Sequence, residues 1–307
     1  MNENGTIQYL KQEQIDKTKW DACVESAANG LVYGYSFYLD TMAANWEALV
    51  YNDYKFIMPL TWNKKWGVKY LYQPFITAQL GIFGNDLNSA IRDQFIAAIP
   101  SQYKYIDIAL NSGNILETPH PYSFPRSNFI LDLNKPYETI YNQYNENSKR
   151  NIKKCNQQAG FVKKNIDVEK IISLATAQMK MQGQVPEENI SRFRTLYHLL
   201  SKKGMAVNYS IYLNNDEIAA SAVFFYSHHR AYYILVGNHT SGRDSGASHA
   251  LIDAFIKDNA GKKNCLDFEG SDIASLASFY KGFGAQNEPY PALKINRLPF
   301  ILRWMKR

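Results

Sequence analysis

Between Gly261 and Arg297 the sequence passes from strand spacing to helical spacing and back to a strand. Residues Cys265 to Glu269 alternate in character, which predicts a strand with apolar side chains on one face and Asp267 and Glu269 on the other. Gly270 interrupts the alternation and predicts a turn. The sequence therefore predicts a strand that ends in two carboxylates and is followed directly by a turn.

A helix is expected after this turn, because Ser271 or Asp272 can cap it with a side-chain oxygen. Four apolar or aromatic residues then recur at 3-4-3 spacing, which places them on one helical face. Gly282 or Gly284 would end the helix, and a last strand is expected at Ala292–Ile295. The four residues of the helical face are Ile273, Leu276, Tyr280 and Phe283.

The cysteines and the composition exclude several classes of protein. Cys23, Cys155 and Cys265 are far apart and odd in number, so neither a disulfide framework nor a zinc-type CxxC pair is present, and no metal is expected. No apolar run approaches the ~20 residues that span a bilayer, and the polar N-terminus lacks the apolar core of a signal peptide. We therefore expect a cytoplasmic protein without a membrane span. GxSxG nucleophile turns and Walker-type phosphate loops are also absent from the sequence.

Helical and strand-like spacing alternate along the rest of the chain, which indicates an α/β protein. With 307 residues the chain is long enough for two domains. The proline-rich segment Glu117–Phe129 excludes a continuous helix and is the expected crossing between them. A single long helix is expected at Tyr137–Gln158, and a hairpin at Asn214–Asp216. Further helices are expected at Gln12–Ala28, Tyr33–Trp46, Asp86–Ile99, Ile166–Met181, Ser191–Lys202 and Ser248–Asn259, and strands at Glu47–Tyr51, Tyr54–Leu60, Lys69–Tyr72, Tyr105–Ala109, Phe129–Leu133, Ala206–Leu213, Ile218–Tyr226 and Arg230–Val236.

The order strand, turn, helix, strand between Gly261 and Arg297 resembles the C-terminal half of the GNAT acyltransferase fold. Its segment SFYKGFGA resembles the tyrosine-bearing segment of that family. The passage from Phe129 to Lys164 is similar to the entry of the second domain in Fem-type (FemAB-like) relatives, where a basic-Asn-Ile-basic run follows a Leu-Asp-Leu strand. Here that run is Lys149 to Lys154. The resemblance implies two GNAT-like domains of mixed α/β class, each a mixed sheet flanked by helices, with residues 1–134 in the first and 135–307 in the second.

The turn from Arg243 to Ser248 lies between an expected strand and an expected helix. A helix start with small residues exposes backbone N–H groups, and the helix dipole favours an anion there. In GNAT enzymes a basic/Gln-x-x-Gly-x-Gly/Ala turn holds the coenzyme A pyrophosphate, so the resemblance implies that Arg243, Gly246, Ala247 and Ser248 bind the donor. Ser248 stands where Gly or Ala is usual, and Asp244 would place a negative charge beside the phosphate. An ordinary capped loop stays open as the alternative.

Positive charge is concentrated in two acid-free segments. In the first, Lys149, Arg150, Lys153 and Lys154 form a basic cluster that can bind the phosphates of tRNA or of a nucleotide-linked acceptor. A solvated helix face explains the same pattern equally well. The second segment is the C-terminal part of the chain from Pro289 onward, and it is expected to be a solvated basic tail.

Two residues of the opening stretch are candidates for proton transfer. The resemblance implies that Tyr280 protonates the leaving thiolate or ribose oxygen, whereas its place in an apolar stripe is equally typical of a core tyrosine. Glu269 is the candidate for accepting the proton of the attacking amine, because it lies nearest the carboxyl edge of its strand. A carboxylate paired with a nearby lysine or arginine is the alternative for Asp267 and Glu269 alike.

These features together predict an N-acyltransferase that moves an acyl or aminoacyl group to an amine acceptor, either a small molecule or a cell-wall precursor. Acyl-coenzyme A or aminoacyl-tRNA would be the co-substrate, and such chemistry needs no permanently bound cofactor. Two alternatives stay open: a non-enzymatic RNA-binding module that uses the basic helix, and a catalytically dead GNAT-like scaffold.

Overall fold

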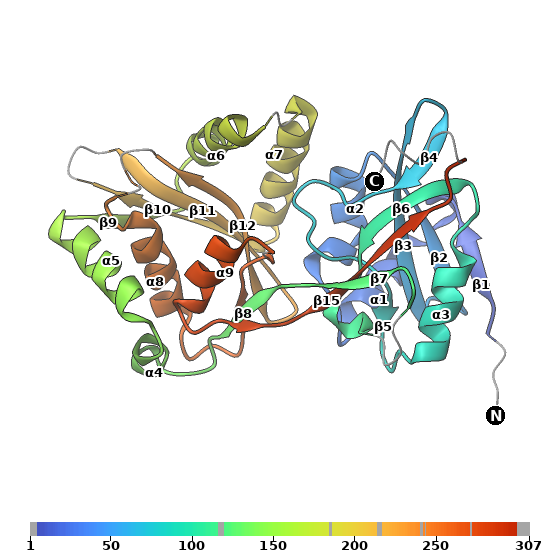
Figure 1. Ribbon diagram of the computed structural model, residues 1–307, viewed down its shortest axis with the longest axis horizontal. Coiled ribbons are helices and arrows are strands. Elements are labelled where there is room, and N and C mark those ends of the chain that lie inside the picture. Colours follow the sequence, from blue (N-terminus) through green and yellow to red (C-terminus); the bar gives the residue numbers. More distant parts are fainter. Residues whose placement is uncertain are drawn as a thin grey trace. The chain divides into compact units, whose positions relative to one another are not determined.

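The computed structural model describes residues 5–115, 120–183, 186–213, 217–239, 242, 244–270 and 272–299. The chain divides into two compact units, unit 1 (Met1–Arg126 with Pro289–Arg307) and unit 2 (Ser127–Glu288) (Figure 1). This division differs from the boundary that the sequence suggests after residue 134, and it returns the C-terminal segment to unit 1. Arg243, Ser271, the hairpin expected at 214–216 and the basic tail from residue 300 lie outside the described residues.

Unit 1 is built on one mixed sheet with the strand order β1-β2-β3-β4-β6-β15-β7, and β5 pairs with β3. The last strand of the chain, β15, lies between β6 and β7, which is why the C-terminal segment belongs to this unit. Its elements in chain order are β1 (Ile7–Leu10), η1 (Gln12–Gln14), α1 (Lys17–Ser26), η2 (Val32–Gly34), α2 (Ser36–Met42), β2 (Asn45–Tyr51), β3 (Phe56–Lys65), β4 (Val68–Leu71), β5 (Phe83–Gly84), α3 (Ser89–Ala98), β6 (Tyr103–Ala109), η3 (Ser112–Asn114), β7 (Ser123–Arg126) and β15 (Tyr290–Asn296).

Unit 2 has a second mixed sheet with the strand order β14-β8-β13-β12-β11-β10-β9. Its elements in chain order are β8 (Phe129–Asp132), α4 (Tyr137–Asn142), α5 (Glu146–Gln157), β9 (Phe161–Lys164), α6 (Val168–Gln182), α7 (Glu187–Lys202), β10 (Ala206–Tyr212), β11 (Ile218–Ser227), β12 (Arg230–Asn238), α8 (Ala247–Asn259), β13 (Cys265–Asp267), α9 (Ala274–Lys281) and β14 (Gln286–Asn287). The strand that the sequence predicts from Cys265 is present as β13, and it is an interior strand that is parallel to β12 and antiparallel to β8.

Helices cover both faces of the unit 2 sheet, as two neighbouring phenylalanines of β11 show. Phe224 stacks on Phe255 of α8 with ring centroids 3.8 Å apart, whereas Phe225 stacks on Phe193 of α7 at 6.0 Å. Successive side chains of a strand point to opposite faces, so α8 and α7 must lie on opposite sides of the sheet. Figure 1 shows α6 and α7 on one side and α5, α8 and α9 on the other. A strand covered on both faces has no need of polar residues, and this explains the continuous apolar run of β11.

The two units repeat one order of elements, although the sequence contains no evident repeat. From β1 in unit 1 and from β9 in unit 2, a strand and two helices are followed by three antiparallel strands, a helix and a strand parallel to the third one. In unit 2, β8, α4 and α5 precede this series. The parallel pairs are β4 with β6 in unit 1 and β12 with β13 in unit 2. The fold is thus mixed α/β in both units, which confirms the predicted fold class.

Two predicted helices are wrong in extent. The single helix expected at Tyr137–Gln158 is broken into α4 and α5, because the side chain of Asn145 accepts a hydrogen bond from the Ser148 N–H at 2.8 Å and starts a new helix. The helix expected at Tyr33–Trp46 ends at Met42, and Trp46 belongs to β2. Trp46 packs against Trp20 of α1, with centroids 5.1 Å apart, so tertiary contact decides its conformation.

Candidate active site

Strands β12 and β13 separate in the middle of the unit 2 sheet. Their parallel pairing spans three residue pairs, from Arg230↔Cys265 to Tyr232↔Asp267, while β12 continues to Asn238. After β13 the backbone N–H of Phe268 bonds to the Phe129 carbonyl of β8 at 2.9 Å, so the chain turns away from β12. An opening at the carboxyl end of a parallel pair is where open α/β sheets bind ligands.

The edge of β12 that faces this opening carries backbone donors. The N–H of His239 bonds to Ala219 in β11, whereas the N–H of Asn238 turns the other way and bonds to the Gln178 side chain of α6 at 3.0 Å. Hydrogen-bonding direction alternates along a strand, so the N–H of Val236 points to the same side as that of Asn238. Ile234 has no partner in β11, since the register skips one residue there, and bulges of this kind are common beside active sites.

Three aromatic rings of the buried core lie next to the end of β13. Tyr280 of α9 stacks on Phe268 with centroids 4.5 Å apart and an interplanar angle of 20°, and Phe268 meets Tyr233 of β12 edge-on at 6.0 Å. Burial, together with the negative charges of Glu269 and Asp267, raises the pKa of Tyr280 to about 12. Because Phe268 precedes Glu269, its stack on Tyr280 places the two residues predicted to transfer protons in the same region of unit 2.

The helical face expected around Tyr280 is only half buried. Tyr280 and Phe283 are in the core, but Ile273 is 60% exposed and Leu276 is 40% exposed. The predicted cap at Asp272 is also wrong, because α9 begins after Ile273 without a side-chain cap and Asp272 accepts a hydrogen bond from the Ser127 N–H at 3.0 Å instead. The spacing of apolar residues identifies the face of a helix and not how far along it the core extends.

The two carboxylates of the strand end have different partners. Asp267 forms an ion pair with Arg230 of β12 at 2.5 Å, and Arg230 also pairs with Glu288 at 2.9 Å. Burial opposes the charge of Arg230, but Asp267 and Glu288 raise the pKa of Arg230 above its usual value. Of the two alternatives for these carboxylates, Asp267 therefore takes the paired structural one, while Glu269 follows Phe268, the ring that stacks on Tyr280.

At the candidate phosphate turn, the backbone of α5 packs directly against Gly246. Gly246 adopts a left-handed conformation with φ 78°, and a Cβ placed there would lie 2.1 Å from the carbonyl oxygen of Asn151 in α5. The Ser245 hydroxyl accepts a hydrogen bond from the Ala247 N–H at 3.2 Å, and the Ser248 hydroxyl donates to Asn238 at 3.0 Å. Glycine is thus required at position 246 by close helix packing. A valine there would test the contact between α5 and α8 before it tested any ligand.

The basic cluster lies on α5, the helix that contacts Gly246. Lys149 is 3.5 Å from Glu146, and Arg150 donates to the Asn147 side chain at 2.7 Å. Lys153 and Lys154 are exposed. The cluster is therefore a solvated helix face in part, but one that runs directly past the N-terminus of α8.

His249, in the first turn of α8, is a residue of the site region that sequence reasoning missed. Its ring centroid lies 4.7 Å from that of Phe279 and 5.7 Å from that of Phe283, so it joins α8 to the last turn of α9. Burial lowers the pKa of His249 to about 4. A lone histidine within a helical pattern gives no sign of this role, because only the tertiary fold supplies its aromatic neighbours.

Acid is expected to destabilise unit 2 through His249. Its pKa is depressed in the folded state, so its contribution is fully present above about pH 6.5 and is lost as the pH falls towards 4. The expected loss of unfolding free energy is about 2 kcal/mol after allowing for partial exposure. Urea denaturation of the wild type and of His249→Phe over this range measures it. Equal acid dependence in the two proteins would contradict the assignment.

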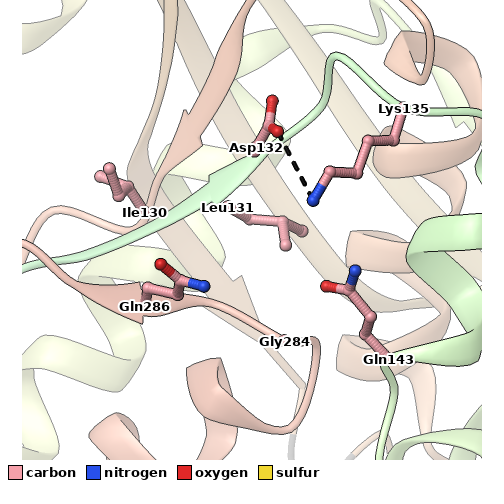
Figure 2. A pocket seen from close by; sticks show the side chains of 7 residues that line it. All are labelled: Ile130, Leu131, Asp132, Lys135, Gln143, Gly284 and Gln286. Carbon is pink, nitrogen blue, oxygen red and sulfur yellow. Dashed lines mark ion pairs between the residues drawn. The ribbon is translucent and has the colours of Figure 1, made fainter.

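A small polar cavity lies on the other side of β13, against β8 and β14. Its volume is about 170 Å³, and Figure 2 shows the Lys135 ammonium and the Gln143 and Gln286 amides pointing into it. Asp132 forms a loose ion pair with Lys135 at 3.7 Å. None of these residues was a predicted site residue.

In unit 1 the corresponding place, beyond the end of the parallel pair β4 and β6, is occupied by the segment that contains Gln73 and Leu80. The edge of β6 beyond its pairing with β4 is bonded by the Gln73 side chain, which accepts from the Ala109 N–H at 3.1 Å, and by Leu80, which bridges Leu110. Asn111 fixes this segment further by donating to the carbonyls of Leu80 and Ile82 at 2.9 and 3.1 Å. Unit 2 therefore holds the better candidate for an active site.

Two searches for other site types complete the geometry. Within the described ranges, no three histidine, cysteine or acidic side chains are grouped so that they could hold a metal ion. No helix in the part of the chain that the structure describes has the length and apolar character needed to cross a bilayer.

Comparison with known proteins identifies the fold. Residues 142–274 match the acetyltransferase (GNAT) domain. The crystal structure of FemX matches with a TM-score of 0.63 and 13% identity, over 98% of this chain and 100% of that one. A conserved protein of unknown function from Bacteroides thetaiotaomicron matches with a TM-score of 0.58 and 13% identity, over 94% and 99%. No curated protein sequence matches the chain.

A third solved structure also matches, the C-terminal domain of a protein assigned as a lysylphosphatidylglycerol synthetase from Agrobacterium fabrum. The TM-score is 0.54 and the identity 9%, with 92% of each chain covered. These likenesses show that the chain has the mixed α/β fold of FemX over nearly its whole length, and that residues 142–274 of unit 2 are similar to the acetyltransferase (GNAT) domain. The domain match supports acyl transfer in general terms and identifies neither the donor nor the acceptor.

Proposed function

We propose that unit 2 transfers an aminoacyl group from aminoacyl-tRNA to an amine acceptor, at the opening between β12 and β13. The observation that carries the proposal is the stack of Phe268, the residue before Glu269, on Tyr280 just after the two parallel strands separate. A carboxylate and a phenol at one opening provide a proton acceptor and a proton donor for acyl transfer. The acceptor is an amine-bearing small molecule or cell-wall precursor, as the resemblance to Fem-type transferases implies.

In the proposed reaction the amine nitrogen attacks the carbonyl carbon of the donor ester, and Glu269 accepts the proton that the nitrogen loses. Backbone N–H groups on the open edge of β12, such as that of Val236, donate to the developing oxyanion. The bond between the carbonyl carbon and the ribose oxygen breaks, and that oxygen takes the proton of Tyr280. Transfer of a proton from Glu269 back to Tyr280 completes the cycle, so that ester and amine become amide and alcohol.

The turn before α8 favours this donor over coenzyme A. A pyrophosphate bound there would need the first backbone N–H groups of the helix. The Ala247 N–H already bonds to Ser245, and the His249 N–H bonds to the Gly246 carbonyl at 3.1 Å. The Asn151 carbonyl oxygen lies against Gly246 and would repel an anion. We therefore assign Gly246, Ala247 and Ser248 to the packing of α8, and Arg243 stays a candidate donor-binding residue.

The chemistry of the leaving group agrees with the same donor. A thiolate with a conjugate-acid pKa near 8.5 leaves readily without protonation, whereas a ribose alkoxide is far more basic and needs a proton donor. Tyr280, whose pKa is about 12, stays protonated at neutral pH and can supply that proton. Lys149, Arg150, Lys153 and Lys154 are proposed to bind the phosphates of the tRNA.

The donor is tested with purified protein and two labelled co-substrates: total tRNA charged with radiolabelled amino acids, and radiolabelled acetyl-coenzyme A. Each is incubated with a panel of amines that includes a lysine-containing cell-wall precursor. We expect label to pass from tRNA to an amine and none to pass from acetyl-coenzyme A. Transfer from acetyl-coenzyme A alone would overturn the donor and keep the acyltransferase. Transfer from neither, with tight binding of tRNA, would favour the RNA-binding module.

A further inference from the structure

We propose that Arg230 is a positioning residue: through Asp267 it fixes the backbone of Glu269 and so directs that carboxylate into the opening. The inference rests on the proposed function, in which Glu269 accepts the proton of the amine. It concerns a different group of atoms, however, because Arg230 starts β12 at the end of the β12–β13 pairing that is away from the opening, and in this assignment it touches no substrate.

Asp267 divides its two oxygens between Arg230 and Glu269. Its Oδ2 atom pairs with the Arg230 guanidinium at 2.5 Å, and its Oδ1 atom accepts the backbone N–H of Glu269 at 2.8 Å. The side chains of Arg230 and Asp267 are 15% and 2% exposed. A buried carboxylate with both oxygens engaged has little freedom to move, so the Glu269 backbone is fixed to an immobile point.

A second chain of contacts reaches the next residue. Arg230 pairs with Glu288 through both of its terminal nitrogens, at 2.9 and 3.1 Å, and the Glu288 N–H bonds to the Asn128 carbonyl at 2.8 Å. The Asn128 side chain then accepts the Gly270 N–H at 2.6 Å. Arg230 is thus connected to two consecutive residues of the turn, Glu269 by way of Asp267 and Gly270 by way of Glu288 and Asn128.

The turn needs such support because both of its residues are left-handed. Glu269 has φ 65° and Gly270 has φ 78°. The left-handed conformation costs a residue with a Cβ roughly 1–2 kcal/mol, which glycine avoids. Other non-glycine residues of the chain also have positive φ, so the conformation alone marks no site. Two buried clamps on one turn, beside the ring of Tyr280, indicate that the direction of the Glu269 side chain is being controlled.

The inference is tested by a double-mutant cycle on the transfer of label from charged tRNA to the amine acceptor. Asp267→Asn keeps an acceptor for the Glu269 N–H but weakens the hold of Arg230. We expect it to lower kcat about 10-fold with KM for tRNA unchanged. In a Glu269→Ala background the same change should have no further effect on kcat, because the carboxylate that it positions is gone. A merely structural role would lower kcat equally in both backgrounds.

Asp258→Asn is the matched control. Asp258 also forms an ion pair, with Lys164 at 2.6 Å, but it lies on α8. It should leave kcat unchanged. Glu288→Gln, whose side chain reaches the surface, replaces Asp267→Asn if that variant does not fold, and the same non-additivity is expected. Wild-type kcat in the variant used, or equal losses in both backgrounds, would overturn the positioning role alone. Full activity of Glu269→Ala would overturn the proton acceptor of the proposed function and the positioning role with it.

Discussion

Replacing Tyr280 by phenylalanine is expected to lower kcat by ~10²-fold and to leave the KM for the tRNA donor unchanged. The phenylalanine ring keeps the stack on Phe268, which lies 4.5 Å away, and removes only the hydroxyl. The pKa of Tyr280 is about 12, so the wild-type hydroxyl stays protonated up to pH 10 and beyond. Deprotonation of Tyr280 should therefore not lower the wild-type rate between pH 6 and 10. The wild type and Tyr280→Phe should show the same pH dependence of the rate on the alkaline side of this range.

Tyr212 provides the matched control for this prediction. It is buried in the same sheet and stacks on Phe161 at 5.7 Å, at the edge away from the opening. Tyr212→Phe removes an equivalent hydroxyl and should keep full kcat. An unchanged kcat in Tyr280→Phe would make this tyrosine a core residue, as its apolar helical stripe suggests. A rise in KM with unchanged kcat would mean that the hydroxyl binds the donor and does not protonate it.

The sequence predicts those parts of the site that depend on local pattern. Alternation around Leu266 and Phe268 predicts β13, because a strand must separate its two faces, and the structure confirms the strand. The tyrosine-bearing segment predicts Tyr280 as a site residue, and in the structure Tyr280 stacks on Phe268, directly after β13. These signals are carried by neighbouring residues, so they can be read without knowledge of the fold.

The remainder of the site depends on contacts between residues far apart in the chain. Gly246 and Asn151 are far apart in the sequence, so their contact cannot be predicted from it. The sequence pattern around Gly246 therefore indicates phosphate binding, whereas close packing against Asn151 is what requires a glycine there. Arg230 and Asp267 become partners only when β12 and β13 pair. Ile273 fits a helical stripe and is nevertheless exposed, because the core covers only the C-terminal part of α9 and does not reach its first turn. Periodicity carries no information on any of these points.

The basic cluster on α5 supplies the second large effect that we expect. Four phosphate contacts should make the slope of log K for RNA binding against the logarithm of the salt concentration steeper by about 3 than without these contacts. Changing Lys149, Arg150, Lys153 and Lys154 to alanine should remove that difference and weaken the binding of uncharged tRNA by about 10²- to 10³-fold at 0.1 M salt. Fluorescence titrations with labelled tRNA at several salt concentrations measure both quantities.

Net charge alone would produce part of this loss, so the control must change it equally. Lys202, Lys203, Lys262 and Lys263 are exposed lysines of unit 2 outside α5, and their joint replacement by alanine removes the same four charges. If α5 contacts the RNA, this control should keep most of the affinity and the full salt slope. Equal losses in the two proteins would reduce the cluster to a solvated helix face that attracts RNA only at long range. Because α5 lies against the N-terminus of α8 at Gly246, phosphates held by α5 would lie beside the helix that connects β12 to β13.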